Sequence, residues 1–310
     1  MTRRLPQQLA PGETHEHRVD RVLAHGRTAI QGWELLELGI YGPALVLDGA
    51  IQSTAGDEAC YHEALHMPAQ MARPDARRVL LIGGANGASL PRVLLLPALE
   101  HVTLVDVDAE LHAVSRTARA GLHGTSLEDP RLDLVFGAPD AEVAALAAAG
   151  ARFDLVIADT PDATEGSYSA RLFAAERIGA IRDLLAPGGL FVTQAGQAHP
   201  LACGFTARVL ATLRGAFADV ALYTHNVPSF GTPWCFAIAG GDLSALHALE
   251  PATIEARLAR LPAGALVAYD GETHRHMLAL PRALREALAR AAPTAEPIRL
   301  DAPAHVVVAG

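Results

Sequence analysis

The chain contains no lysine, and all 25 of its basic residues are arginine. This absence excludes the Schiff-base lysine of pyridoxal phosphate enzymes and the lysine of a P-loop. Cysteine is scarce as well, because only Cys60, Cys203 and Cys235 occur, an odd number of residues placed far apart. Such spacing indicates reduced thiols in a cytoplasm rather than a disulfide framework or a zinc knuckle.

Long apolar runs are missing too. No uncharged apolar stretch approaches 18 residues, so we expect no membrane span. Arg3 and Arg4 are not followed by the apolar segment of a signal peptide. The formal net charge of −9 disfavours nucleic acid as a partner and is compatible with a cationic ligand. We therefore expect a cytoplasmic protein with no membrane and no nucleic-acid partner.

The 310 residues, half of them hydrophobic, are enough for one large domain or two modest ones. Residues 1–27 are polar and read as a loosely held arm. Between 28 and 53 short apolar runs are broken by glycine, which predicts a small antiparallel β-module. A helix is expected over 57–72. We divide the chain into 1–72 (arm, β-module and linking helix) and 73–310 (a Rossmann-like catalytic domain with a C-terminal tail).

Beyond residue 78 apolar strands alternate with helices, which predicts an α/β protein with a doubly wound, Rossmann-like sheet of the methyltransferase type. Late strands near 220–239 are expected to be antiparallel, and Val306–Val308 could add an edge strand. The expected strands are Val79–Ile82, Val102–Val105, Leu132–Phe136, Leu155–Ala158, Leu190–Gln194, Val220–Thr224 and Trp234–Ala239. The expected helices lie near 88–97, 108–121, 140–149, 170–185, 201–216 and 251–260.

The segment 78–108 combines a strand, a glycine-rich turn, a helix and a second strand that ends in an acid. In the turn Gly83–Gly87, glycine lets the backbone approach a ligand where a Cβ would collide. Asp106 is placed to accept hydrogen bonds from ribose hydroxyls. The spacing is not G-x-G-x-x-G, which favours a nucleoside without a diphosphate, such as S-adenosylmethionine or its decarboxylated form. An α/β turn that binds nothing is the alternative.

Other polar groups follow the carboxyl ends of the predicted strands, where open α/β sheets bind ligands. These positions include Gly137-Ala138 and Gln194. The strand Leu155–Ala158 delivers Asp159 and Asp162 to this edge. Two carboxylates three residues apart can hold an ammonium group or take a proton from it. The alternative for Asp162 is that it only caps the following helix.

Residues His62-Glu63-Ala64-Leu65-His66 match H-E-x-x-H, the zinc helix of metalloproteases. A five-residue pattern arises easily by chance in a chain with 14 histidines, and we interpret it as a decoy and expect no metal site. His62 is better interpreted with Tyr61 as a polar pair on a helix that lines the ligand cleft. Tyr61 could equally be a core aromatic with a satisfied hydroxyl.

With these residues in place, the chain from about Gln31 to Leu288 resembles the spermidine synthase (polyamine aminopropyltransferase) family. The order and spacing of several segments together carry the resemblance. These segments are VLDGAIQSTAGDEACYHEAL, VLLIGGANGAS, VTLVDVD, EDPRLDLVFGA, FDLVIADTPD, LLAPGGLFVTQAG, VPSFGTPWCFAIA and YDGETHRHMLALPRALREAL. The resemblance implies an N-terminal β-module, a Rossmann-like catalytic domain and a homodimer or homotetramer.

The resemblance also implies roles for individual residues. Asp159 would be the catalytic proton acceptor, and Asp162 would bind the amine substrate. Other positions matching the family's substrate-binding residues are Tyr61, His62, Asn86, Tyr168 (in a loop that closes over the substrates) and Phe230. Positions matching its nucleoside-binding residues are Gln52, Gly83, Gly84, Asp106, Ala138 and Gln194.

Several ligand-facing positions depart from the family. Asn86 stands where the family has an aspartate that holds the cationic aminopropyl arm, and Ala138 where it has an aspartate that reads the adenine amino group. Asp140 nearby could substitute for the latter. Phe230 replaces a tyrosine, and the loop after Asp162 lacks the family's Pro-x-Gly-Pro. These differences concern the substrate pair more than the fold.

The expected reaction is attack of a primary amine on a carbon bonded to a sulfonium sulfur, with release of methylthioadenosine. The donor is decarboxylated S-adenosylmethionine, the acceptor is a small cationic amine of the putrescine type, and no metal is required. Two alternatives stay open. One is methyl or aminocarboxypropyl transfer from intact S-adenosylmethionine, which the neutral Asn86 could tolerate. The other is a non-catalytic protein that binds a nucleoside or polyamine.

Overall fold

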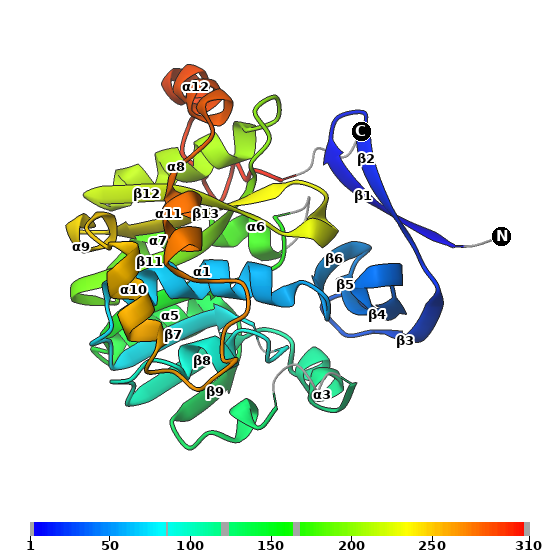
Figure 1. The fold of residues 1–310 in the computed structure, drawn as a ribbon, viewed down its shortest axis with the longest axis horizontal. Coiled ribbons are helices and arrows are strands. Elements are labelled where there is room, and N and C mark those ends of the chain that lie inside the picture. The colour runs from blue at the N-terminus through cyan, green and yellow to red at the C-terminus, as the bar shows by residue number, and fades with distance from the viewer. Residues whose placement is uncertain (1–2, 85, 119–123, 164–167, 307–310) are drawn as a thin grey trace.

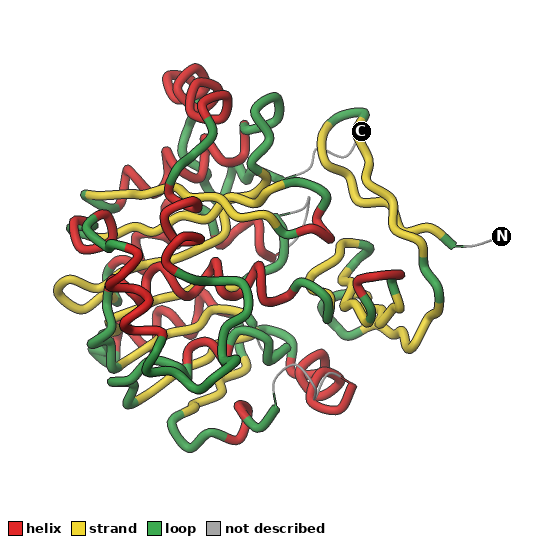
Figure 2. The backbone as a smooth tube through the Cα atoms, viewed as in Figure 1, coloured by secondary structure: helices red, strands yellow, loops and turns green. Residues whose placement is uncertain are grey.

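The computed structural model describes residues 3–84, 86–118, 124–163 and 168–306. Its strands form a two-stranded hairpin, a four-stranded sheet and a seven-stranded sheet (Figure 1). The hairpin and the four-stranded sheet belong to the N-terminal part of the chain and lie at one side of the large sheet (Figure 2). The predicted α/β architecture with a small antiparallel N-terminal β-module is confirmed.

The large sheet has the strand order β12-β13-β11-β10-β7-β8-β9. The five strands from β11 to β9 are parallel, whereas β13 runs antiparallel to both β11 and β12. The late antiparallel strands are therefore present as predicted. The bounds are β7 Arg78–Gly83, β8 His101–Asp106, β9 Leu132–Phe136, β10 Phe153–Asp159, β11 Leu185–Gln197, β12 Asp219–Asn226 and β13 Pro233–Gly240.

Helices cover both faces of this sheet, because successive side chains of a strand point to opposite faces. In β7, Val79 and Leu81 pack in one core with α1, α2, α9, α10 and α11, while Leu80 and Ile82 pack in a second core with α5, α7, α8 and α12. Figure 1 shows α1, α10 and α11 on the near face. The helices are α1 Glu58–Ala72, α2 Leu90–Val93, α3 Ala109–Ala118, α5 Pro139–Ala148, α6 Tyr168–Leu172, α7 Ala175–Arg182, α8 Gly204–Ala216, α9 Ser244–His247, α10 Pro251–Leu258, α11 Gly271–Leu278 and α12 Arg282–Ala291.

The N-terminal segment is not the loose arm that its polarity predicts. It forms the hairpin of β1 and β2 and supplies β3, the edge strand of the four-stranded sheet β3-β4-β5-β6. Leu5 and Leu9 point inward from β1, whereas most other hairpin side chains face solvent. The bounds are β1 Arg4–Ala10, β2 Glu13–Arg18, β3 Arg21–Arg27, β4 Gly32–Glu37, β5 Pro43–Leu47 and β6 Ala50–Thr54.

Two helical expectations differ from the structure. The helix expected over 88–97 shortens to the single turn of α2, and the one over 170–185 divides into α6 and α7. In the C-terminal tail, Val306 donates its backbone N–H to Ala163 without belonging to a strand, while 307 and 308 lie outside the described residues. Among the described residues, none of the helices has the length and apolar character that a membrane crossing requires. The division of the chain at residue 72 stays a prediction.

Candidate functional site

A cavity of about 770 Å³ opens at the carboxyl ends of β7, β8 and β10, with the four-stranded sheet forming its other wall. This edge is where an open α/β sheet binds its ligands. Ten of the residues singled out from the sequence line the cavity. They are Gln52, Tyr61, His62, Gly83, Gly84, Asn86, Asp106, Asp159, Asp162 and Phe230.

The glycine turn lies against the end of β10. Gly83 and Gly84 both adopt positive φ angles, +83° and +79°, which L side chains rarely adopt. A Cβ on Gly83 would collide with the backbone oxygen of Asp159, and one on Gly84 would lie 2.8 Å from Oδ2 of Asp159. The turn therefore requires glycine in order to bring β7 and the Asp159 carboxylate together.

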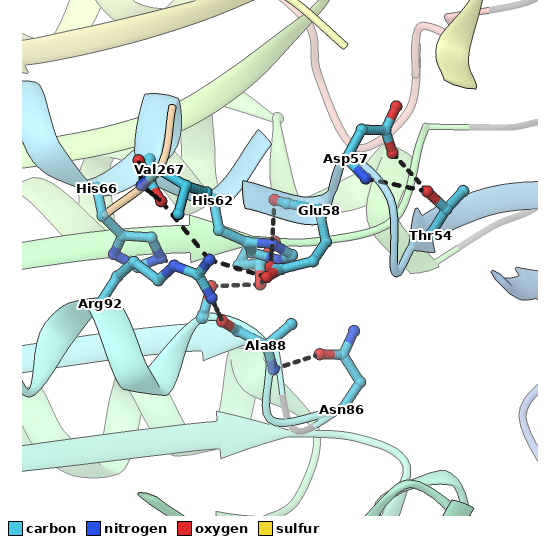
Figure 3. A network of polar contacts seen from close by, with 12 residues as sticks. Thr54, Asp57, Glu58, His62, His66, Asn86, Ala88, Arg92 and Val267 are labelled. Carbon is cyan, nitrogen blue, oxygen red and sulfur yellow. Dashed lines mark hydrogen bonds and ion pairs between the residues drawn. The ribbon is translucent and has the colours of Figure 1, made fainter. Parts of the chain in front are cut away.

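Asn86, in the same turn, is engaged with its own backbone. Its Oδ1 accepts the N–H of Ala88 at 3.0 Å (Figure 3). The amide carries no charge, so it cannot form an ion pair with an ammonium group. Asn86 lines the cavity, and its side-chain NH2 group can donate hydrogen bonds.

Asp106 ends β8 and begins a set of hydrogen bonds that ties the two walls together. Its Oδ1 accepts the N–H of Asp108 at 2.9 Å. Oδ2 of the buried Asp108 accepts from Oγ1 of Thr28 at 2.7 Å and from Nε2 of Gln31 at 2.9 Å. The N-terminal sheet is thus anchored at the strand end that the sequence assigns to a ribose.

Asp159 is the last residue of β10 and is 8% exposed. Its Oδ2 accepts a hydrogen bond from Oγ of Ser89 at 2.6 Å. Nε2 of His62 lies 3.8 Å from the same oxygen. A carboxylate held in this way has a defined direction at the cavity wall, which is what a proton acceptor needs.

The second carboxyl, Asp162, lies in the loop after β10. Burial raises the pKa of Asp162 from 3.8 to about 7. Asp162 precedes the first residue of α6, Tyr168, by six positions, so it does not serve as an N-cap of that helix. Burial, together with the charges of Asp159 and Asp162, raises the pKa of Tyr61 well above 10, so its hydroxyl stays protonated.

A buried charge network supports His62 from behind (Figure 3). Nδ1 of His62 lies 2.8 Å from the backbone oxygen of Glu58 and 2.9 Å from Oε2 of the same residue. Arg92 donates to Oε1 of Glu58 at 2.8 Å. Burial alone would raise the pKa of Glu58, but the hydrogen bond and charge of His62 together with Arg92 bring it below its ordinary value. The network therefore holds Glu58 ionised.

The residues of the H-E-x-x-H pattern have separate partners within the protein. Glu63 accepts the backbone N–H groups of Val267 and Ala268, and Nε2 of His66 lies 2.7 Å from Oγ of Ser89. In the part of the chain that the structure describes, no group of three or more His, Cys, Asp or Glu side chains could hold a metal ion.

Phe230 is positioned by the short 3₁₀ helix η3, Pro228–Phe230, which two other segments hold. Asp57 accepts the N–H of Ser229 at 2.6 Å, and Nε2 of His17 lies 2.8 Å from the Ser229 backbone oxygen. The Phe230 ring lies 5.8 Å from the Tyr61 ring, centroid to centroid. These aromatic rings form an apolar side of the cavity next to the carboxylates.

Two predicted residues lie outside the described lining, and the side chain of a third, Tyr168, is not among the parts that the structure describes. Gln194 is buried in β11, where its Oε1 accepts from Gly196 and Trp234. Ala138 is the N-cap residue of α5, while its neighbour Pro139 lines the cavity. Tyr168 begins α6, and the loop residues 164–167 before it lie outside the described residues. The binding roles assigned to these three stay predictions.

Sequence reasoning missed several residues of the site. Asp48, Thr160 and Arg171 also line the cavity. Asp48 belongs to the glycine-broken segment 28–53, whose pattern predicts turns but does not indicate which of them reaches the ligand edge. Ser89 and Arg92 support the acids from behind, and their distance from Asp159 in the sequence leaves no local signal.

Comparisons with known proteins all point to one family. A family described as "Spermine/spermidine synthase domain" matches residues 58–247. The chain is 36% identical to a polyamine aminopropyltransferase of Synechococcus sp. (strain JA-2-3B'a(2-13)), with 91% of each chain covered. It is also 36% identical to polyamine aminopropyltransferase 2 of Hyperthermus butylicus, covering 93% of this chain and 94% of that relative.

Solved structures share the fold. A spermidine synthase in complex with the transition-state analogue AdoDATO superimposes with a TM-score of 0.83 at 22% identity, covering 94% of this chain and 97% of that one. The spermidine synthase of Thermotoga maritima gives a TM-score of 0.81, also at 22% identity, and covers 94% of this chain and 96% of its own.

Proposed function

The chain belongs to the spermine/spermidine synthase family, and from this premise we propose that it is a polyamine aminopropyltransferase. It moves the aminopropyl group of decarboxylated S-adenosylmethionine to a primary amine of the putrescine type. The observation that carries the proposal is that a single cavity is lined both by the glycine turn with Asp106 and by the carboxyls of Asp159 and Asp162. A nucleoside donor and a cationic acceptor thus have adjoining places.

The donor's adenosine lies along the glycine turn in this proposal. Asp106 accepts hydrogen bonds from the ribose hydroxyls, and the absent side chains of Gly83 and Gly84 leave room for the nucleoside. Gln52 projects from β6 in the opposite wall and contacts the nucleoside. The sulfonium arm then extends toward Asp159.

The acceptor's two ends meet different groups. Asp162 binds an ammonium group, and Asp159 faces the amine that reacts. Tyr61 and Phe230 cover the methylene chain between them, since aliphatic carbon packs well against aromatic rings. His62 borders Asp159 and limits how far its carboxylate can turn.

The reaction is a displacement at carbon. An alkyl ammonium has a pKa near ~10, like lysine, so the attacking nitrogen first loses a proton. Asp159 accepts that proton directly or through water. The nitrogen lone pair forms the new C–N bond as the C–S bond breaks. The electron pair of the C–S bond stays on sulfur, giving neutral methylthioadenosine. Asp159 contributes by orienting the amine more than by basicity, because an aspartate is a weak base.

Asn86 supports a second candidate donor. A neutral amide at this place does not repel a carboxylate, so intact S-adenosylmethionine is the competing donor to examine. The test incubates the protein with putrescine and each donor separately and weighs the products. Aminopropyl addition from the decarboxylated donor is the expected result. Only methyl or aminocarboxypropyl addition would replace the proposal, and binding without any product would indicate a non-catalytic protein.

We also propose that the protein is cytoplasmic and forms a homodimer or homotetramer. Three unpaired cysteines, two of them buried, are compatible with a reducing compartment. The assembly follows from the family resemblance. Light scattering on the purified protein measures its mass, and a monomer would contradict this part of the proposal.

A further inference from the structure

Two buried polar side chains lie behind Asp159, away from the cavity. Ser89 and His66 are each 0% exposed. Oγ of Ser89 lies 2.6 Å from Oδ2 of Asp159, and Nε2 of His66 lies 2.7 Å from Oγ of Ser89. The three side chains thus form an unbranched chain of hydrogen bonds that ends on the carboxylate.

The direction of these hydrogen bonds follows from the acceptor at the end. An ionised carboxylate only accepts, so Ser89 donates its hydroxyl proton to Asp159. The Ser89 oxygen then accepts from His66, whose proton is on Nε2. Nδ1 of His66 is then the unprotonated ring nitrogen. It is buried without a hydrogen-bond partner among the described residues. Burial, with smaller electrostatic contributions from His62 and Arg92, lowers the pKa of His66 well below 6.5, so the ring is neutral.

We propose that Ser89 and His66 are positioning residues for the reaction, which hold Oδ2 of Asp159 so that Oδ1 is presented to the attacking amine. The inference rests on the role of Asp159 proposed above. A hydrogen bond to a charged acceptor is stronger than one between neutral groups, and the His66 donor polarises the Ser89 hydroxyl further.

The surroundings leave the carboxylate little other freedom. The position of a Cβ on Gly84 lies 3.4 Å from Cβ of Ser89 and 2.8 Å from Oδ2 of Asp159, so the turn packs tightly against both side chains. His62 approaches Oδ2 from the α1 side. Every contact of the carboxylate group named here is made through Oδ2, which leaves Oδ1 for the substrate.

The same chain is not an exit for the proton that Asp159 takes up. Its donors point toward Asp159. Reversing them would move the His66 proton from Nε2 to Nδ1, where the described residues provide no acceptor. The proton therefore leaves through the cavity, and the role of Ser89 and His66 is orientation.

A double-mutant cycle tests this inference. Ser89→Ala is expected to lower kcat by about 10-fold to 100-fold, the equivalent of ~1.5–3 kcal/mol for a hydrogen bond to a charged group. His66→Leu is expected to lower kcat by a smaller factor, because His66 bonds the neutral Ser89 hydroxyl. KM for the donor should stay unchanged, because neither residue lines the cavity. In the Ser89→Ala background, His66→Leu should have little further effect on kcat, since His66 acts through Ser89. His66→Gln, which keeps a donor near the Nε2 position, should recover most of kcat.

Two substitutions away from the site serve as matched controls. Ser115→Ala removes a buried hydroxyl from α3, and His274→Leu removes a buried imidazole that contacts Tyr269. Both should change the urea midpoint to a similar degree as the test variants while leaving kcat as in the unmodified protein. They separate loss of packing from loss of orientation.

The outcomes distinguish two failures. A kcat within twofold of the unmodified protein in Ser89→Ala, with Asp159→Asn strongly impaired, would overturn the positioning role and leave that of Asp159 intact. Fully additive losses in the cycle would also overturn it. An unimpaired Asp159→Asn would instead remove the proposed role of Asp159 itself.

Discussion

A Cβ atom on Gly84 would lie 2.8 Å from Oδ2 of Asp159, a separation that real Cβ atoms essentially never show. The backbone of Gly84 has φ +79° as well. The carboxylate of Asp159 therefore occupies its place because residue 84 has no side chain. The glycine turn, which the sequence suggests for contact with a nucleoside, also shapes the catalytic end of the cavity.

We predict that Gly84→Ala lowers kcat at least 10-fold, because the added methyl displaces the Asp159 carboxylate. Part of any loss of stability comes from the backbone alone, since an L residue in this region costs about 1–2 kcal/mol. Gly150→Ala is the control, because Gly150 has φ +72° but no atom within 4 Å of its Cβ position. Urea unfolding and kcat are measured for both variants. Equal effects on kcat would show that the contact with Asp159 is unimportant.

Asp162 predicts a pH dependence of amine binding. Burial raises the pKa of Asp162 to about 7, and only its ionised form pairs with an ammonium group. The amine itself stays protonated across this range, so KM for the amine should rise as the pH falls below 7. The limiting slope is about 10-fold per pH unit. Asp162→Asn should bind the amine weakly at all pH values and lack this slope. The same slope in that variant would contradict the assignment.

The stability of the ligand-free protein gives an independent check on Asp162. Between its ordinary pKa of 3.8 and about 7, the folded protein holds a proton that the unfolded chain has released. The contribution of Asp162 therefore becomes less favourable as the pH rises through this window. Asp162→Asn should stabilise the free protein at pH 8, with the difference disappearing near pH 4. Urea unfolding at both pH values measures it, and a difference that grows toward acid pH would be contradictory.

Replacing the buried Arg92 is expected to lower the free energy of unfolding substantially. Its side chain pairs with Glu58 at 2.8 Å and lies 3.8 Å from Glu63, and removing it leaves buried carboxylates without their cation. Arg92→Met should cost about 3–5 kcal/mol at pH 7, because breaking a buried pair on one side exposes the full desolvation penalty. Arg282→Met is the control: its ion pair with Glu286 is largely exposed, and its loss should cost under about 0.5 kcal/mol.

The pH dependence of the Arg92 variant has a definite sign. In the unmodified protein, Glu58 has a lowered pKa, so its contribution is present above the ordinary value of 4.5 and is lost as the pH falls through the folded-state value. Without Arg92, Glu58 can take up a proton more readily. The gap in stability between the two proteins should therefore narrow from pH 7 to pH 4. A gap that stays constant would show that Arg92 acts through packing alone.

Much of the fold could be predicted because the core strands carry a local signal. The apolar runs of β7, β8, β9, β10 and β13 fall within two residues of their observed bounds. The hairpin of β1 and β2 could not be found in this way, because Glu13–Arg18 is polar throughout and only His17 in it is buried. For α12 a usable signal existed: Leu284, Ala287 and Leu288 have the spacing of one helix face and are buried together.

The site residues that could be predicted are those at the carboxyl ends of the core strands. Asp106 and Asp159 could be predicted because each follows a buried strand, and the topology of the sheet places those two strand ends on either side of the end of β7. Ser89 and His66 could not be found, since their proximity to Asp159 depends on how α1 and α2 pack on the sheet. The H-E-x-x-H pattern suggests a zinc ligand at His66, whereas the ring of His66 contacts Ser89.

The central claim is that Asp159 accepts the proton of an amine during aminopropyl transfer. Its most direct test is a single-turnover reaction of the protein with decarboxylated S-adenosylmethionine and putrescine, followed by mass spectrometry, beside the same reaction with Asp159→Asn. The account predicts an aminopropylated amine and methylthioadenosine, formed roughly 10²-fold or more slowly by the folded variant with donor binding retained. Equal rates in the two proteins would contradict it.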